Sequence, residues 1–406
     1  MRKFFIYFFL SFFIVLAACE ESEELDEKDP IEESGDEINN VNDIVADNND
    51  NIWVGTDSGL YKLNGTTKLN YTTADGLISD VITCLVMDKN DKLWIGTNNG
   101  VSCFADNVFT NYTTDDGLIN NDIRSIALDR ENNIWIGTAK NGVSMFDGID
   151  FSNFNINSTM GHIHTITCDS VGNIWVGSCM NGLSMFNPSE GVWTYGIENF
   201  NYFVETSFCD SNGDVWVCYT GGTFKKDEDV WTKVKLMNVI DHLFVLDFEE
   251  DANNNFWLAT YSGLYYFNGT DWNVFLTKDG LKDIYIKCLE ADNIGNLWIG
   301  TNKGITKISI NDKPIITNDL DGFWQGKTGN NDDCYLLVDD NKIMYFGYGE
   351  RIIESNTGIE IAIDAFAFYA YNYTCVKGEF TDQTNASGEF RNESESFTWN
   401  VTKTVL

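Results

Sequence analysis

Short blocks of alternating hydrophobic and polar residues run along most of the chain, and the same arrangement returns about every forty residues. In the second such unit, β-prone runs at 81–87, 93–97, 101–104 and 108–113 are separated by turns rich in Asp, Asn and Gly. Alternation with a period of two is typical of strands, and helical spacing is absent throughout. Each unit is therefore predicted to form four short strands.

A tryptophan phrase marks every unit, for example DNIGNLWIGTNKG at 292–304. The phrase occurs seven times, with Trp at positions 53, 94, 135, 175, 216, 257 and 298 and an Asp six residues before each. Four strands in a unit of about forty residues are typical of a propeller blade. The sequence therefore predicts an all-β fold, a seven-bladed β-propeller of four-stranded blades over residues 38–318.

The tryptophan strand indicates how the blades pack. In a segment such as IWVGT, Trp and Gly point to one side of the strand and the flanking aliphatic residues to the other. We expect the indole to fill the wedge between neighbouring blades and the glycine to make room for it. A single blade cannot bury both faces, whereas seven in a ring can. The outer-strand residues Trp193, Trp231 and Trp272 are expected to be structural as well.

These phrases resemble the two-component regulator propeller repeat, Asp-x-x-Gly-x-hydrophobic-Trp-hydrophobic-Gly-Thr-x-x-Gly-hydrophobic, and more loosely the streptogramin lyase propeller. The resemblance implies the propeller fold and a relation to the periplasmic sensor half of hybrid histidine kinases, which often sense glycan fragments. The chain departs from that arrangement, because its sequence shows one set of seven blades and neither a transmembrane run nor a kinase. The fold is expected to carry over and the signalling output is not.

Two further segments flank the repeats. Residues 319–406 show alternating, aromatic-rich runs and are predicted to form a small C-terminal β domain. The last unit needs an outer strand to complete it, and the sequence PIITN at 314–318 or a segment from the N-terminal side could supply that strand.

The N-terminus reads as an export signal. Residues 1–18 combine Arg2 and Lys3 with an apolar run, and LAAC before position 20 resembles the lipobox of bacterial lipoproteins. The resemblance implies lipidation of Cys19, and an ordinary signal peptide is the alternative. Residues 19–37 form an acidic tether, which resembles the surface-export signal of lipoproteins in the Bacteroidota. We expect an outer-membrane lipoprotein held by its N-terminal lipid and exposed at the cell surface, with the periplasmic face as the alternative.

Charge and cysteine usage exclude several functions. The formal net charge is −36, and no basic stripe exists to neutralise phosphates, so nucleic acid is not an expected partner. Without Cys19 nine cysteines remain, an odd number, and no Cys/His ligand spacing is present. We expect neither a bound metal nor a cofactor.

One position of the repeat changes residue type from unit to unit, whereas the structural positions keep the same type. We call the seven equivalent residues at this position a column. The residue five before each turn aspartate is, in order, Asn42, Thr83, Arg124, His164, Glu205, Leu246 and Lys287. The loops after the tryptophan strands add Lys140, Met180, Tyr219, Tyr261 and Lys303 and should reach the same end of the ring. From these two groups the predicted ligand-binding residues are Arg124, His164, Glu205, Lys287, Lys140, Tyr219, Tyr261 and Lys303. Basic and tyrosine side chains there would suit an anionic or a sugar ligand.

Two functional hypotheses follow from the sequence. The first is a lipid-anchored binding protein, not an enzyme, that captures a glycan or an envelope protein. The alternative is a propeller lyase or hydrolase that uses His164, Glu205 and a metal. Catalysis needs a convergent acid–base or metal cluster, and three histidines in the whole chain make such a cluster hard to assemble.

Overall fold

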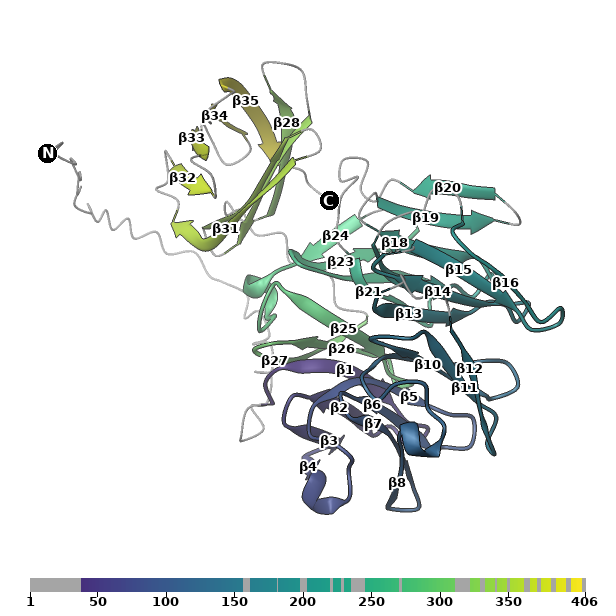
Figure 1. Ribbon diagram of the computed structural model, residues 1–406. Coiled ribbons are helices and arrows are strands. Elements are labelled where there is room, and N and C mark those ends of the chain that lie inside the picture. Colours follow the sequence, from purple (N-terminus) through teal and green to yellow (C-terminus); the bar gives the residue numbers. More distant parts are fainter. Residues whose placement is uncertain are drawn as a thin grey trace, which may run out of the picture. The chain divides into compact units, whose positions relative to one another are not determined.

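The computed structural model of the protein describes the backbone of residues 38–403, apart from 156–160, 181, 198–202, 220–221, 228–229, 235–244, 270–271, 311–321 and the connections between strands beyond 321. Side chains are described up to Ile310. Figure 1 shows the strands. Among the described residues, short 3-10 helices form η1 (Thr73–Asp75), η2 (Thr114–Asp116) and η4 (Thr277–Asp279).

Seven antiparallel sheets form the blades of a β-propeller, each built from one continuous stretch of chain with its first strand innermost. Blades 1 to 4 comprise β1 (Val41–Ala46), β2 (Ile52–Thr56), β3 (Gly59–Asn64) and β4 (Thr67–Tyr71); β5 (Ile82–Met87), β6 (Leu93–Thr97), β7 (Gly100–Ala105) and β8 (Val108–Tyr112); β9 (Ile123–Leu128), β10 (Ile134–Thr138), β11 (Val143–Phe146) and β12 (Phe151–Phe154); and β13 (Ile163–Cys168), β14 (Ile174–Ser178), β15 (Gly182–Asn187) and β16 (Val192–Thr194). Blades 5 to 7 comprise β17 (Val204–Cys209), β18 (Val215–Tyr219), β19 (Gly222–Asp227) and β20 (Val230–Val234); β21 (Val245–Glu250), β22 (Phe256–Thr260), β23 (Gly263–Phe267) and β24 (Trp272–Phe275); and β25 (Ile286–Ala291), β26 (Asn296–Thr301) and β27 (Gly304–Ser309). The predicted fold class is confirmed.

The ring closes where blade 7 meets blade 1. The innermost strand β25 contacts β1, and Figure 1 shows the strands of blade 7 beside β1. The amide of Asn40 donates to the carbonyl of Asn302 at 2.9 Å, which joins the chain before β1 to blade 7. β1 itself pairs with β2 of its own blade. The predicted closing strand at 314–318 lies outside the described residues.

One aspartate organises the turn and the core of every blade. In blade 3, Oδ1 of Asp129 accepts the amides of Glu131 and Asn133, and Oδ2 accepts the indole N–H of Trp135 at 3.0 Å. The same three bonds recur in all seven blades, with indole distances from 2.8 to 3.2 Å. The sequence indicated the turn role of this aspartate but not its bond to the indole.

In blade 1 these bonds also affect the pKa of the turn aspartate, Asp47. Burial alone would raise the pKa of Asp47, but hydrogen bonds from Asn51 and from the indole of Trp53 outweigh it and hold that pKa below its usual range. Blade 5 carries Asp214 where most blades have Asn, and Lys225 compensates the second charge at 2.6 Å.

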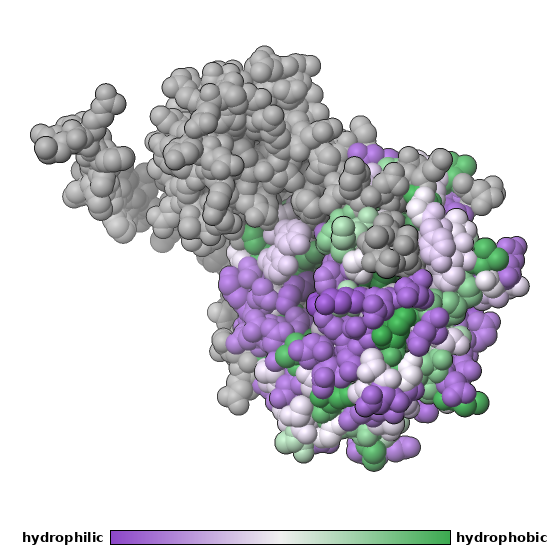
Figure 2. Space-filling model, viewed as in Figure 1, coloured by the Kyte–Doolittle hydropathy of each residue, from purple (hydrophilic) through white to green (hydrophobic). Residues whose placement is uncertain are grey.

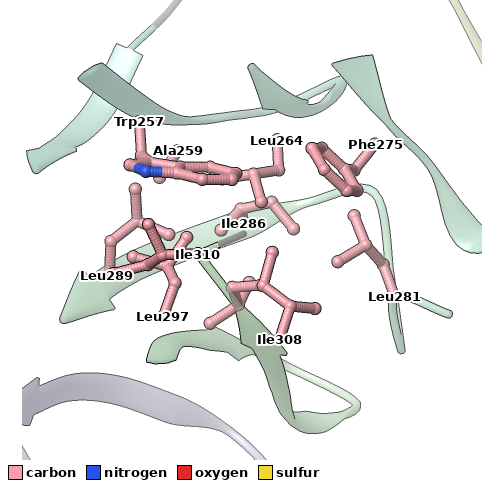
Figure 3. Close-up of a cluster of buried hydrophobic side chains, with 11 residues drawn as sticks. Trp257, Ala259, Leu264, Phe275, Leu281, Ile286, Leu289, Leu297, Ile308 and Ile310 are labelled. Carbon is pink, nitrogen blue, oxygen red and sulfur yellow. The ribbon is translucent and has the colours of Figure 1, made fainter. Parts of the chain in front are cut away.

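The indoles fill the wedges between blades, as predicted. Trp257 of blade 6 packs on Ile286, Leu289 and Leu297 of blade 7, a cluster in which Figure 3 shows its ring lying over the aliphatic side chains. Trp257 and Trp135 are 0% and 1% exposed, so these rings are core residues. The wedge is closed only when the next blade is present, which explains why each blade needs a neighbour and why the ring must close.

The glycine of the tryptophan strand has a different role from the one predicted. A Cβ on Gly55 would lie 2.5 Å from Cγ2 of Ile82, the first residue of the next innermost strand, and the same contact recurs at Gly137 with Ile163. The glycine therefore makes room for a β-branched residue of the neighbouring blade, not for the indole. Free Cys84 completes the packing at Gly96, where an added Cβ would be 2.4 Å from its sulfur.

Beyond the propeller, eight antiparallel strands form one sheet in the order β31-β30-β29-β28-β35-β34-β33-β32. Their bounds are β28 (Gly322–Thr328), β29 (Asp333–Asp339), β30 (Lys342–Tyr348), β31 (Arg351–Glu360), β32 (Phe366–Ala370), β33 (Thr374–Phe380), β34 (Asn385–Arg391) and β35 (Ser396–Lys403). Each strand pairs with its sequence neighbour except at β31 and β32, and β28 pairs with β35. The role of this region as a separate domain stays a prediction.

Replacing Asp129 by Ala should destabilise the propeller by about 3 kcal/mol, because a buried indole N–H and two turn amides lose their acceptor together. Urea unfolding of the full chain, followed by tryptophan fluorescence, measures this loss. Glu131→Ala in the same turn is the control and should change stability by less than about 0.5 kcal/mol, since its side chain is exposed. Equal effects of the two substitutions would contradict the role assigned to Asp129.

Candidate functional site

The variable column coincides with a β-bulge in every blade. The pairing between the first two strands of each blade skips one residue, for example between Ile123 and Ser125 of β9. The residues skipped in blades 1 to 7 are Asn42, Thr83, Arg124, His164, Glu205, Leu246 and Lys287. A bulge leaves its extra residue outside the ladder and re-aims the side chain. Side chains in this column are therefore free to vary without disturbing strand pairing.

The bulges and the loops after the tryptophan strands lie at one end of the ring. The amide of Ala139, in the loop of blade 3, donates to the carbonyl of Asp122 just before β9 at 2.8 Å. The amide of Cys179 makes the equivalent bond to His162 in blade 4 at 3.1 Å. The two predicted groups of residues thus share this end, which we call the bulge end.

Lys287 and Asn42 join the last blade to the first at the bulge end. Nζ of Lys287 donates to Oδ1 of Asn42 at 2.6 Å, and Nδ2 of Asn42 donates to Oδ1 of Asp57 at 2.8 Å. Burial lowers the pKa of Lys287, while Asp57 opposes that effect. The result is a hydrogen-bonded row of three polar side chains across the closing contact.

Arg124 and His164 come from neighbouring blades. Arg124 forms an ion pair with Asp122 at 3.0 Å, and the ring of His164 lies 4.5 Å from that of Phe203. Burial, followed by the charges of His162 and Arg124, lowers the pKa of His164. Its neutral imidazole can therefore donate one hydrogen bond and accept another.

Glu205 follows His164 around the bulge end, on β17. Burial raises the pKa of its carboxyl to about 7. Because this pKa is close to neutral pH, both the protonated and the ionised carboxyl are accessible there. Within the part of the chain that the structure describes, the Glu205 side chain makes no ion pair.

Tyr219 replaces a residue that the other blades use for folding. In blade 2 the hydroxyl of Thr97 donates to the carbonyl of Gly100 at 2.8 Å and holds the loop after the tryptophan strand. A Thr or Ser does the same in blades 1, 3, 4, 6 and 7. In blade 5 Tyr219 stands at this position, half-buried, with its ring 5.5 Å from that of Phe224. A structural hydroxyl has thus been exchanged for an aromatic ring at the bulge end.

The other predicted loop residues differ in surroundings. Tyr261 stacks on Tyr285, with ring centroids 4.9 Å apart. Lys303 pairs with Asp283 at 3.2 Å. Lys140 is exposed, and its backbone carbonyl accepts the hydroxyl of Thr138. Two of the three thus join local pairs, while Lys140 stands on the surface.

Sequence reasoning missed a second column two residues before the bulge. Asp122, His162, Phe203 and Tyr285 all occupy it and touch or flank predicted residues. Counting back seven residues from each turn aspartate would have found the column.

Figure 2 shows hydrophilic residues over most of the propeller side in view, with hydrophobic residues in small separate patches.

The described side chains form no group of three or more His, Cys, Asp or Glu residues arranged to hold a metal ion. The rings of His162 and His164 lie 6.5 Å apart, centroid to centroid. In the same part of the chain, no helix has the length and hydropathy of a membrane span.

The sequence profile of the two-component regulator propeller matches residues 36–58, 76–99, 117–140 and 280–303. These stretches contain the turn aspartate and the tryptophan strand of blades 1, 2, 3 and 7. The chain carries two-component regulator propeller repeats. Blades 4, 5 and 6 lie outside the matches, and blades 5 and 6 replace the repeat glycine by Cys218 and Ala259. No curated protein matches the chain in sequence.

Solved structures share the fold of these repeats. The extracellular domain of the hybrid two-component system BT3049 from B. thetaiotaomicron has a TM-score of 0.59 and 18% identity, over 88% of this chain and 52% of that one. This chain therefore spans about half the length of that domain. A catalytically inactive variant of virginiamycin B lyase from Staphylococcus aureus, solved with quinupristin, has a TM-score of 0.56 and 13% identity, over 68% of this chain and 98% of the lyase.

The imidazole of His164 should titrate below 6.5, the usual value for histidine, because burial favours its neutral form. Replacing Arg124 by Gln should move this pKa upward, since a neighbouring positive charge is removed. NMR titration of the histidine ring protons measures both, with His164→Asn to assign the signal among three histidines. A pKa at or above 6.5 in the unsubstituted chain would contradict the placement of this ring.

Proposed function

We propose that the bulge end of the propeller binds a neutral glycan and that the protein is a capture module on the outer face of the cell envelope, anchored through lipidated Cys19. The observation that carries the proposal is the alternation of aromatic rings and paired polar groups at this end. Tyr261 with Tyr285, Tyr219 with Phe224, and Phe203 with His164 supply ring faces. Ring faces for stacking and planar polar groups for hydrogen bonding are what sugars need.

A neutral ligand suits this end better than an anion. The cations Arg124 and Lys303 already pair with Asp122 and Asp283, so an anion would have to displace a carboxylate. Asp122 depends on Arg124 for its ion pair, and its second carboxylate oxygen is buried and accepts no hydrogen bond from any described residue.

The proposed localisation at the cell envelope is supported by the N-terminal sequence and by a structurally similar domain. LAAC and the acidic tether are the features expected of an exported lipoprotein. The similar B. thetaiotaomicron domain is extracellular and belongs to a two-component system. The proposed role of this chain is to capture a ligand and to pass it to, or display it for, an envelope partner.

A glycan array followed by calorimetry tests the binding proposal on the full chain in detergent. Arg124→Ala and Tyr261→Ala should each weaken glycan binding about tenfold, which corresponds to about 1.4 kcal/mol. Arg130→Ala is the matched control, because Arg130 lies on the same blade in the turn at the other end of β9, and it should leave affinity unchanged.

Two outcomes would overturn this function. Equal loss of binding in Arg124→Ala and Arg130→Ala would place the ligand elsewhere. Turnover of the bound glycan into smaller products, detected by mass spectrometry and abolished by His164→Ala, would replace a capture module by the lyase alternative.

A further inference from the structure

The innermost strands are joined to one another by side chains that accept backbone amides. In blade 3 the hydroxyl of Ser125 accepts the amide of Ile166 in blade 4, and Thr165 accepts the amide of Ser207 in blade 5. These bridges on one side of the ring are made by neutral hydroxyls. They join the innermost strands of adjacent blades to one another.

On the other side of the ring the bridges are made by carboxyl groups. Asp247 accepts the amide of Leu289 at 2.8 Å and Glu249 that of Ala291 at 3.4 Å, both from blade 6 to blade 7. Two more carboxyls continue the series. Glu290 accepts the amide of Ala46 at 2.7 Å, from blade 7 to blade 1, and Asp43 accepts that of Leu85 at 2.7 Å, from blade 1 to blade 2. We call Asp43, Asp247, Glu249 and Glu290 the carboxyl arc.

The carboxyl arc gathers four acids where the ring closes. The four side chains keep some solvent exposure, yet the surrounding strands enclose them deeply. No salt bridge to any of the four is present among the described residues. The other titratable groups that face them from the packed strands are Cys84 on β5, Glu250 on β21, and Lys287, Cys288 and Asp292 on or just after β25.

Burial and mutual repulsion both favour the protonated form of these acids. Burial, then the charge of Asp247, raises the pKa of Asp43 to about 7 against the pull of its two amide bonds. Burial raises the pKa of Asp247 to about 6. The pKa values of Glu249 and Glu290 are raised by burial and by the carboxyls around them. A protonated carboxyl keeps a carbonyl oxygen that accepts the amide, so the bridges survive protonation.

We propose that the carboxyl arc is a proton-operated clasp: with protons bound it holds blades 6, 7, 1 and 2 together, and on ionisation the repulsion among its four charges loosens the closing contact. This inference is independent of the proposed glycan function. It also reaches the bulge end, because Lys287 and Asn42 stand on the strands that carry Glu290 and Asp43.

The direction of the pH effect follows from proton linkage. Above the ordinary carboxyl pKa of about 4, the folded chain holds protons that the unfolded chain has released. The stabilisation is present in mild acid and is lost as the pH rises through the raised folded values of about 6 to 8. The thermal midpoint of the full chain should therefore fall between pH 5 and pH 8.

Thermal unfolding of the full chain between pH 5 and pH 8 tests the clasp. The double variant Asp43→Asn Glu290→Gln keeps the amide acceptors without the charges and should lose at least half of the pH-dependent fall. Asp50→Asn is the matched control on blade 1, since Asp50 is exposed in the turn after β1, and it should retain the whole fall. An unchanged slope in the double variant would overturn the proposal.

A second measurement uses the unsubstituted chain, so it tests the proposal even if the double variant fails to fold. The amide signals of Leu85 and Leu289, which bond directly to Asp43 and Asp247, should shift with inflections between pH 6 and pH 8. Inflections near pH 4 in both signals would show ordinary carboxyls and would overturn the clasp.

Discussion

The hydrogen bond from an indole to an aspartate six residues earlier is the interaction on which the propeller depends. It ties the turn between the first two strands of a blade to the ring that fills the wedge to the next blade. The aspartate is buried with its charge, which is tolerable because three N–H groups solvate it. Turn geometry and blade packing are thereby fixed by one side chain, seven times over.

Much of the fold can be predicted from the sequence because strands and turns are marked by residues that are close together in the chain. Strand limits in the second blade agree with the prediction to within a residue, since Gly and Asp turns bound each run. The glycine of the tryptophan strand shows where local reasoning fails. Its contact is with Ile82, more than twenty residues away in the next blade, and only the arrangement of one blade against another reveals it.

The candidate site illustrates the same limit. The column from Asn42 to Lys287 could be recognised because it varies within a repeat that otherwise does not. The bulge that explains this freedom could not, since it depends on how β1 pairs with β2. The partners Asp122 and Tyr285 were missed because each became significant only beside Arg124 or Tyr261 in space. Nor does the sequence reveal that carboxyls and hydroxyls divide the inner ring between them.

The recurrent bulge separates two tasks within a single strand. Residues that pair or pack are held to a narrow choice, while the unpaired residue carries no such obligation. These positions can then change while strand pairing is kept, although Asn42 and Lys287 also hydrogen-bond to each other across the closing contact. Binding specificity and folding are therefore encoded by different residues of the same strand. Proteins built on the same repeats can acquire new ligands by substitution at the bulge positions without first losing their fold.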